Sequence, residues 1–282
     1  MRIISFGVVT DIHYGFDLGN KKGSQAPRLL ENFFKRANRI GVDFTVDLGD
    51  RVIYQGRDTN LVSTREAGLA QDISYLTKVK EHFNKAAAPH YSVNGNHDHG
   101  HMSANDNARI LGLPDTSYSR DIKGIHFVFW NPNTRVIDGG REMHAFAENI
   151  EWLKNDLAQT DKPSVIFCHI PFDDLNDKPY VDKDHPEKWI FPSYYAESKD
   201  IRKILEDSGK VIQCHFGHLH RNRHREINGI HYFQHQSLVQ KNENTGHARN
   251  ASWIVTIDLD SAETRLQGYG KGQKNRTVQL TL

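Results

Sequence analysis

The chain has 282 residues, with 36 lysines and arginines against 35 aspartates and glutamates, two cysteines and 17 histidines. The length suits one large domain or two small ones, and it predicts a sizeable core that needs no cross-links. A formal net charge of +1 argues against a polyanion-binding or membrane-attracted surface, and two cysteines exclude a disulfide framework. The many histidines point to metal or proton chemistry, because histidine is the commonest metal ligand and titrates near neutrality.

The N-terminal apolar stretch is short and interrupted by Ser5 and Gly7, which favours a buried strand over a signal peptide. No apolar run approaches the length of a membrane span. Cys168 and Cys214 lie in apolar, strand-like runs and are interpreted as reduced core thiols. We therefore expect a cytoplasmic protein with no membrane association.

The first three quarters of the chain alternate predicted strands and helices. Apolar runs followed by Asp, Gly, Asn or His predict strands at 3–9, 43–48, 90–93, 164–168 and 211–216. Apolar residues at helical spacing predict helices at 29–40, 69–83, 150–157 and 198–208. Ser198 is the expected cap of the last helix, and Lys123-Gly124 is the expected turn of a hairpin over 118–130.

The last quarter is antiparallel in character. Asn228-Gly229 between 222–227 and 230–235 is a strong hairpin signal, and two more strands are expected at 252–258 and 263–269. A chain with βα units first and antiparallel strands last predicts an α/β protein with some α+β character. We expect two mixed sheets with helices outside them, in a single domain over residues 1–282.

Polar signatures follow five of the predicted strands, and loops after strand carboxyl ends are where open α/β sheets place ligand sites. In chain order they are Asp11-Ile12-His13, Gly49-Asp50, Gly95-Asn96-His97-Asp98, His169-Ile170-Pro171 and Gly217-His218-Leu219-His220. Carboxylate, amide and imidazole groups suit Mn, Fe, Zn, Co or Mg. Their number exceeds what one tetrahedral ion needs, so it favours two metal ions, which can clamp both oxygens of an in-line displacement at phosphorus.

This ordered set of motifs, D-x-H, GD, GNHD, H and GHxH, resembles that of the calcineurin-like metallophosphoesterase superfamily and extends from residue 11 to residue 220. The resemblance implies an αββα sandwich of two mixed β-sheets flanked by helices. It implies that Asp11, His13 and His220 hold one metal ion. It also implies that Asn96, His169 and His218 hold the other, with Asp50 bridging the two.

The same resemblance gives His97 a catalytic role near the phosphate, where it protonates the leaving oxygen or stabilises developing charge. It implies that Asp98 orients His97. Ile53 occupies the position of the metal-bound tyrosine of purple acid phosphatases, and His97 the position of an arginine in lipid-A diacylglucosamine hydrolases, so both subgroups are disfavoured.

We expect hydrolysis of a phosphodiester or pyrophosphate in a small nucleotide-type substrate. The alternatives are a phosphomonoesterase, including a protein phosphatase, and a non-catalytic scaffold on the same fold. Overall neutrality argues against a processive nuclease, which normally presents a basic track. The sequence predicts neither the metal identity nor the oligomeric state.

Residues outside the motifs are interpreted more simply. The long segment 172–198 holds Trp189, Phe191, Tyr194 and Tyr195 beside Lys178, Lys183 and Lys188. Its aromatic residues are expected to fold back onto the core, with stacking on a nucleobase as the alternative. Arg51 is expected to cap a helix or form a surface ion pair in preference to contacting phosphate, and His99 and His101 are expected to be loop residues. Arg221, Arg223 and the polar stretch 236–250 are candidates to line the cleft.

Overall fold

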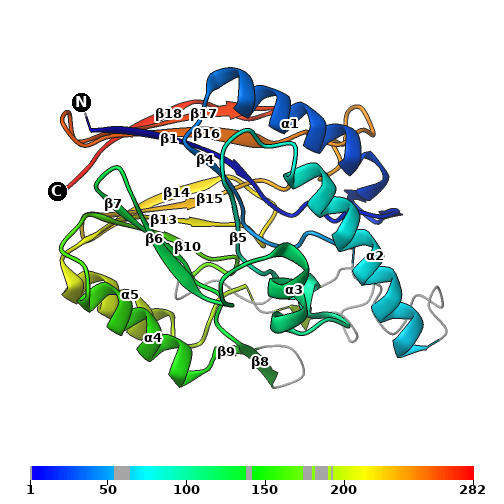
Figure 1. The fold of residues 1–282 in the computed structure, drawn as a ribbon, viewed down its shortest axis with the longest axis horizontal. Helices are drawn as coiled ribbons and strands as arrows, with labels where there is room; N and C mark the ends of the chain where they lie inside the picture. The colour runs from blue at the N-terminus through cyan, green and yellow to red at the C-terminus, as the bar shows by residue number, and fades with distance from the viewer. Residues whose placement is uncertain (1, 54–63, 138–141, 174–179, 182–189, 192) are drawn as a thin grey trace.

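The computed structural model describes residues 2–53, 64–137, 142–173, 180–181, 190–191 and 193–282. Two six-stranded sheets dominate it (Figure 1). In spatial order, the first sheet contains β18 (Arg276–Gln279), β17 (Glu263–Tyr269), β16 (Ser252–Asp258), β1 (Ile3–Val9), β4 (Phe44–Asp47) and β5 (His90–Ser92). The second contains β14 (Arg223–Ile227), β15 (Ile230–Gln234), β13 (Val211–Phe216), β10 (Ser164–Phe167), β7 (Ile125–Phe129) and β6 (Tyr118–Ile122).

Both sheets are mixed. In the first, β1, β4 and β5 run parallel, and β16 pairs with β1 in the antiparallel sense. In the second, β7, β10, β13 and β15 run parallel, while β6 and β14 are antiparallel edges. The short strand pairs are β2 (Asp17–Leu18) with β3 (Lys21–Lys22), β8 (Thr134–Ile137) with β9 (Glu142–Ala145), and β11 (Tyr180–Val181) with β12 (Ile190–Phe191).

The helices lie outside the two sheets (Figure 1). Buried side chains of α1 (Ala26–Ile40), such as Phe33, and of α2 (Arg65–Phe83), such as Val79, pack with Val9 of the first sheet. Those of α4 (Ala147–Ala158) and α5 (Ser198–Ser208) pack against the second sheet, and α3 (Ala104–Leu111) lies beside α2. Between the sheets, the ring of Phe6 stacks on Phe44 at 4.9 Å and meets Phe127 of the second sheet edge-on at 5.8 Å. The expected four-layer αββα sandwich is confirmed.

The main elements agree closely with the sequence predictions, including both hairpin turns, but several details differ. Ser198 is the first residue of α5, not its cap, and its hydroxyl donates to the carbonyl of Tyr195 at 2.6 Å. The sequence patterns do not predict helix α3, strand β18 or the short strand pairs β2–β3, β8–β9 and β11–β12. Cys168 and Cys214 are free and buried. Among the described helices, none is both long and apolar enough to cross a bilayer.

Candidate metal centre

The five polar motifs meet at one rim that both sheets share. They follow β1, β4 and β5 in the first sheet and β10 and β13 in the second. Backbone hydrogen bonds connect the loops: the amide of Asp11 donates to Gly49 O at 2.9 Å, that of His13 to Asp50 O at 2.9 Å, and that of Gly217 to His169 O at 3.0 Å. The amide of His218 donates to Asp11 Oδ2 at 3.2 Å, which joins the loops of the two sheets into one framework.

Left-handed backbone conformations concentrate in these loops. Among the described residues other than glycine, nine have positive φ, and five of them are Asp11 (50°), His13 (41°), Asp50 (55°), His218 (71°) and His220 (47°). Such conformations are costly for residues with a Cβ and persist where the surrounding structure imposes them, which is common at functional sites. The fold thus maintains strain at five of the seven predicted metal ligands.

The first predicted ligand set is gathered tightly. One potential ligand atom from each of Asp11, His13, Asp50 and His220 lies within 4.8 Å of the others. His220 Nε2 is 3.1 Å from both Asp11 Oδ1 and His13 Nε2. Two imidazole nitrogens and two carboxylates around one point form a set that could hold a metal ion.

The second predicted set lies on the other side of Asp50. His218 Nδ1 is 2.9 Å from Asn96 Oδ1, and the rings of His169 and His218 are 5.3 Å apart. Asp50 Oδ2 is 3.4 Å from His169 Nε2 and 3.8 Å from His13 Nε2. The structure therefore brings all seven predicted ligands together and places the Asp50 carboxylate between the two sets.

Hydrogen bonds from outside the sets orient two of the imidazoles. His169 Nδ1 is 2.6 Å from the carbonyl of Leu48, and His220 Nδ1 is 2.9 Å from Oε1 of Gln240. Each Nδ1 acts as the donor, because a backbone carbonyl and an amide oxygen only accept. In the neutral form of each ring, the lone pair is then on Nε2, the nitrogen that faces the carboxylates, as metal-binding histidines require.

The donor set fits a bound cation. Asp11 Oδ1 and His169 Nε2 are buried and, among the described residues, make no hydrogen bond of good geometry. Buried polar atoms are nearly always satisfied, because leaving them unpaired costs free energy. One of these atoms belongs to each predicted ligand set, and a cation bound in each set would satisfy it.

Charges within the cluster shift its pKa values in opposite directions. Burial acts to raise the pKa of Asp50, but nearby His169 and His97 hold it well below its usual value. Burial acts against a charged His169, yet Asp50 raises the pKa of this ring to about 9. Burial and the Lys21 ammonium lower the pKa of His97 to about 3, so its ring is neutral at neutral pH.

Comparison with known proteins decides the family. The model of the calcineurin-like phosphoesterase family matches residues 4–222. The chain belongs to the calcineurin-like phosphoesterase family. A search of curated proteins finds no match to this chain.

Solved structures share the fold of this calcineurin-like phosphoesterase at low sequence identity. A dimetal phosphatase from Danio rerio is 16% identical with a TM-score of 0.71, and 99% of each chain is covered. GAP50, the anchor in the inner membrane complex of Plasmodium, is 14% identical with a TM-score of 0.57, covering 99% of this chain and 90% of its own. These likenesses support the fold assignment alone.

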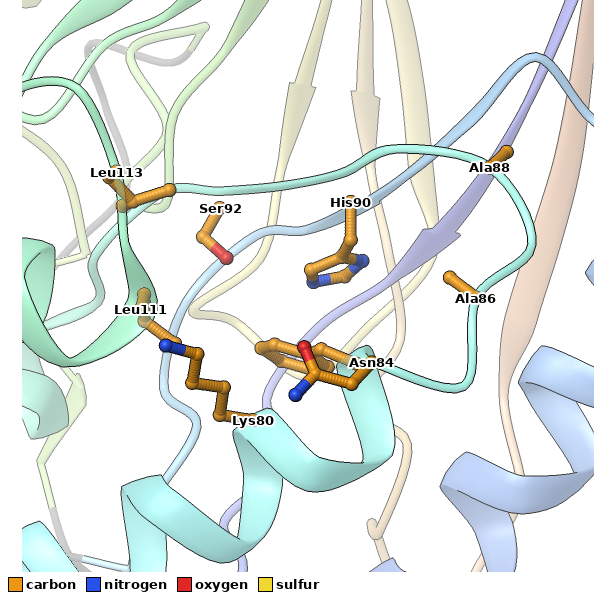
Figure 2. A pocket seen from close by; sticks show the side chains of 9 residues that line it. Lys80, Asn84, Ala86, Ala88, His90, Ser92, Leu111 and Leu113 are labelled. Carbon is orange, nitrogen blue, oxygen red and sulfur yellow. The ribbon is translucent and has the colours of Figure 1, made fainter.

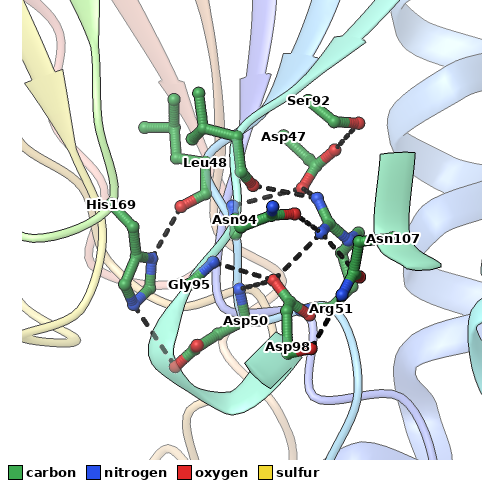
Figure 3. Close-up of polar contacts among 12 residues, drawn as sticks. Asp47, Leu48, Asp50, Arg51, Ser92, Asn94, Gly95, Asp98, Asn107 and His169 are labelled. Atoms are coloured by element: carbon green, nitrogen blue, oxygen red, sulfur yellow. Dashed lines mark hydrogen bonds and ion pairs between the residues drawn. The ribbon is translucent and has the colours of Figure 1, made fainter. Parts of the chain in front are cut away.

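Asp98 differs from its expected role. Its buried carboxylate accepts hydrogen bonds from the backbone amides of Gly95 (2.8 Å), Asp50 (2.9 Å) and Arg51 (2.8 Å) (Figure 3). Within the described part of the chain, Asp98 makes no hydrogen bond with the ring of His97, whose Nε2 lies near Lys21. Burial raises the pKa of Asp98 to about 6 despite the opposite charge of Arg51, so it is ionised at neutral pH. Asp98 therefore organises the backbone around Asp50, and its predicted orientation of His97 is corrected.

The predicted surface role of Arg51 is also wrong. Its guanidinium is fully buried and lies 3.1 Å from Asp47 and 3.2 Å from Asp98 (Figure 3). It also donates to Val93 O, Asn94 Oδ1 and Asn107 Oδ1. Arg51 thus connects the loop that carries Asp50 to β4, to the end of β5 and to α3.

A cavity of about 430 Å³ lies behind this network, between the end of α2, the end of α3 and β5 (Figure 2). His90 and Ser92 in its lining both bond to Asp47, the partner of Arg51. The lining contains none of the predicted metal ligands. The cavity is therefore separate from the candidate metal centre.

The structure also places two tyrosines and two arginines that the sequence singles out. Tyr194 and Tyr195 are buried, which confirms that these two aromatics fold back onto the core; Tyr195 packs 6.1 Å from the ring of Trp130. Arg223 is held by Asp173, and Arg221 lies 3.5 Å from the Tyr194 hydroxyl. Predictions for Lys178, Lys183, Lys188 and Trp189, and for the side chain of Phe191, lie outside the described residues.

The two remaining histidines and the 236–250 stretch are also placed. His99 is exposed at the end of a short 3-10 helix, Asn96–His99, so its prediction as a loop residue is wrong. His101 follows this helix and binds Asp72 of α2 at 2.8 Å. Within 236–250, Ser237 donates to Asp11 O at 2.9 Å, and Gln240 contacts His220. The expectation that this stretch reaches the site is met by these two residues.

Sequence reasoning missed one charged group at the site. The ammonium of Lys21, on β3, lies 3.2 Å from His97 Nε2. Lys21 belongs to no motif, and its neighbour Lys22 looks identical in sequence. Only the pairing of the β2–β3 hairpin with the 236–250 stretch brings it to the rim.

Proposed function

We propose that this chain is a hydrolase that uses two metal ions to cleave a phosphodiester or pyrophosphate in a small nucleotide-type substrate. The observation that carries the proposal is the position of Asp50 between two sets of ligand atoms. Asp11, His13 and His220 would hold one ion and Asn96, His169 and His218 the other, with Asp50 shared. Such ions neutralise charge on phosphoryl oxygens and activate a water nucleophile.

The protein's own contribution is to keep these groups oriented in a connected framework. Asp98 binds the backbone of Asp50, while Leu48 and Gln240 fix the tautomers of His169 and His220. Preorganised polar groups avoid reorganisation during the reaction, which is a major source of catalysis. His97 lies beside the ligands, with its ring 4.8 Å from that of His13, within reach of a phosphoryl group bound there.

Metal identity is the open part of the cofactor assignment. Imidazole, carboxylate and amide donors accept Mn, Fe, Zn or Co. Metal analysis after separate reconstitution with each ion is expected to give two ions per chain for the ions that support activity. Less than one ion per chain under all conditions, together with absent hydrolysis, would favour the scaffold alternative.

The catalytic test compares the manganese-reconstituted wild type with Asp50→Ala on bis(p-nitrophenyl) phosphate. We expect Asp50→Ala to abolish hydrolysis. Asp207→Ala is the matched control, because Asp207 pairs with Lys203 on the exposed face of α5, and it should retain wild-type rates. Wild-type activity in Asp50→Ala rejects the proposal.

Substrate class is tested separately from the requirement for metal. A panel of cyclic nucleotides, nucleotide diphosphate conjugates, CDP-alcohols and phosphomonoesters is compared by kcat/KM. Diester or pyrophosphate substrates are expected to give the highest values. A preference for monoesters, including phosphopeptides, would instead assign the chain as a phosphomonoesterase.

A further inference from the structure

The candidate metal centre combines buried and partly exposed residues. Side chains of Asp11, His13, Asp50 and His169 are at most 3% exposed, whereas those of His97 and His220 are each 17% exposed. Asn96 and His218 are also partly exposed. A substrate that approaches over His97 and His220 would meet the residues that contact these two imidazoles.

Both contacts come from one piece of backbone. Lys21 Nζ lies 3.2 Å from His97 Nε2, and Gln240 Oε1 lies 2.9 Å from His220 Nδ1. Lys21 and Gln240 are paired across an antiparallel bridge. This small sheet thus places one side chain on each of these two partly exposed histidines.

The hairpin that carries Lys21 is firmly held. The amide of Lys22 donates to Val239 O at 2.9 Å, and that of Lys241 donates to Asn20 O at 2.7 Å. At Gly23, directly after β3, an added Cβ would collide with the carbonyl oxygens of His13 and Phe16. The position of Lys21 is therefore fixed relative to the His13 loop.

Lys21 and Lys22 use their charges differently. The Lys22 ammonium is 3.1 Å from the carboxylate of Asp17. Among the ion pairs within the described part of the chain, none includes Lys21. Its ammonium has three N–H donors, and one of them is used on neutral His97, so two remain for another acceptor.

We propose that Lys21 is a substrate-binding residue whose ammonium binds an anionic phosphoryl oxygen beside His97. The inference rests on the proposed function and adds a protein cation to the metal ions. A flexible ammonium with spare donors suits phosphate, which it recognises as a point charge. The loss of a hydrogen bond from a charged group predicts about a 10- to 100-fold loss of affinity.

The test measures binding of inorganic phosphate to manganese-loaded protein by calorimetry, alongside kcat and KM for p-nitrophenyl phosphate and its bis ester. Lys21→Met is expected to weaken phosphate binding about 10- to 100-fold and to lower kcat/KM similarly, with metal content unchanged. Lys21→Arg should retain most of the affinity. Lys22→Met, on the same strand, should behave as the wild type.

Three results would overturn the assignment: wild-type phosphate affinity in Lys21→Met, an equal loss in Lys22→Met, or loss of metal from Lys21→Met. The last would make Lys21 a support of the ligand cluster. If the wild type hydrolyses neither ester, the proposed function fails, but the phosphate affinities still decide the role of Lys21.

Discussion

Asp50 and Arg51 are neighbours in sequence, yet their side chains belong to polar clusters of opposite kinds. Asp50 faces the metal-ligand cluster, where Asp11 Oδ1 and His169 Nε2 are buried without hydrogen bonds of good geometry among the described residues. Arg51 faces the network of Asp47, Asp98 and Asn107, where both terminal nitrogens of its guanidinium meet oxygen acceptors (Figure 3). The first cluster leaves candidate ligand atoms unsatisfied, whereas the second compensates its charges within the protein, although Arg51 Nε is buried there without an acceptor among the described residues.

The difference separates two uses of buried polarity. Incomplete clusters are costly to the folded state and are explained by what they bind. Complete clusters hold the backbone in place, and removing one partner leaves an uncompensated charge. Asp98 connects the two, because its carboxylate pairs with Arg51 and accepts the amide of Asp50. We therefore expect variants of the first cluster to lose mainly activity and variants of the second cluster to lose mainly stability.

The largest effect on activity is expected from Asp50→Asn. The amide retains an oxygen for the His97 amide, which donates to Asp50 Oδ1 at 2.8 Å, but removes the shared negative charge. We expect metal content to fall and kcat/KM to decrease at least about 100-fold. Steady-state kinetics and metal analysis measure this. The metal-free variant should lose less stability than Arg51→Met. A larger loss in Asp50→Asn would contradict the distinction between the two clusters.

The largest effect on stability is expected from Arg51→Met. It leaves Asp47 and Asp98 buried without their cation, which predicts a loss of about 3–5 kcal/mol in the free energy of unfolding. Denaturant unfolding of the metal-free protein measures it. The control is Arg109→Met, whose pair with Asp106 is 70% and 36% exposed and should matter by about 1 kcal/mol or less. Equal losses in the two variants would show that the network is not a stabilising unit.

Sequence patterns predicted the fold well because most of the long strands are apolar runs and most helices have apolar residues at helical spacing. Strand β13 (Val211–Phe216) is buried throughout and its predicted bounds are those observed. Strand β18 (Arg276–Gln279) is largely exposed and polar at the sheet edge, so it has no such pattern. Helix α3 has only eight residues, and its start depends on the Ser103 cap and its capping box.

That the predicted ligands lie close together could be anticipated for a different reason. Its members follow strand ends, where chain direction and sheet topology bring loops together. Lys21 and Gln240 could not be predicted, because their positions depend on a tertiary bridge between two irregular segments. Arg51 was misjudged because charged residues are usually exposed, and only the structure reveals the two aspartates that compensate its burial.

A smaller effect should follow at the far side of the Arg51 network. Asn107 accepts from Arg51 at 3.2 Å and donates to the carbonyl of Asp98 at 2.8 Å. Asn107→Ala leaves both partners short of a hydrogen bond, so we expect a loss of about 1–3 kcal/mol in unfolding free energy. Asn105→Ala, exposed on the same helix, is the matched control and should change stability little. Unchanged stability in Asn107→Ala would show that Asn107 does not contribute to the stability that the Arg51 network provides.

The effect that is smallest at neutral pH concerns a buried polar contact without charge, on the face of the second sheet that packs against the first. His215 Nδ1 lies 2.9 Å from His235 Nε2, and their rings stack 5.2 Å apart. Burial lowers the pKa of both, and that of His235 to about 3, because a cation there would be poorly solvated. In the unfolded chain the pKa of each histidine is about 6.5. The unfolded state therefore binds more protons between pH 6.5 and 3, and stability falls as the pH drops through this window.

For His235 the expected slope approaches about 1.4 kcal/mol per pH unit, and His235→Gln should remove this contribution. The measurement is denaturant unfolding of metal-free protein at a series of pH values from 7 down to about 4. The difference between variant and wild type isolates His235, because the other acid-sensitive groups are common to both. His247→Gln is the control, since His247 is exposed and should leave the slope unchanged. An unchanged slope in His235→Gln would mean that the buried pair accepts a proton in the folded state, so that this cluster, like that of Arg51, compensates charge internally.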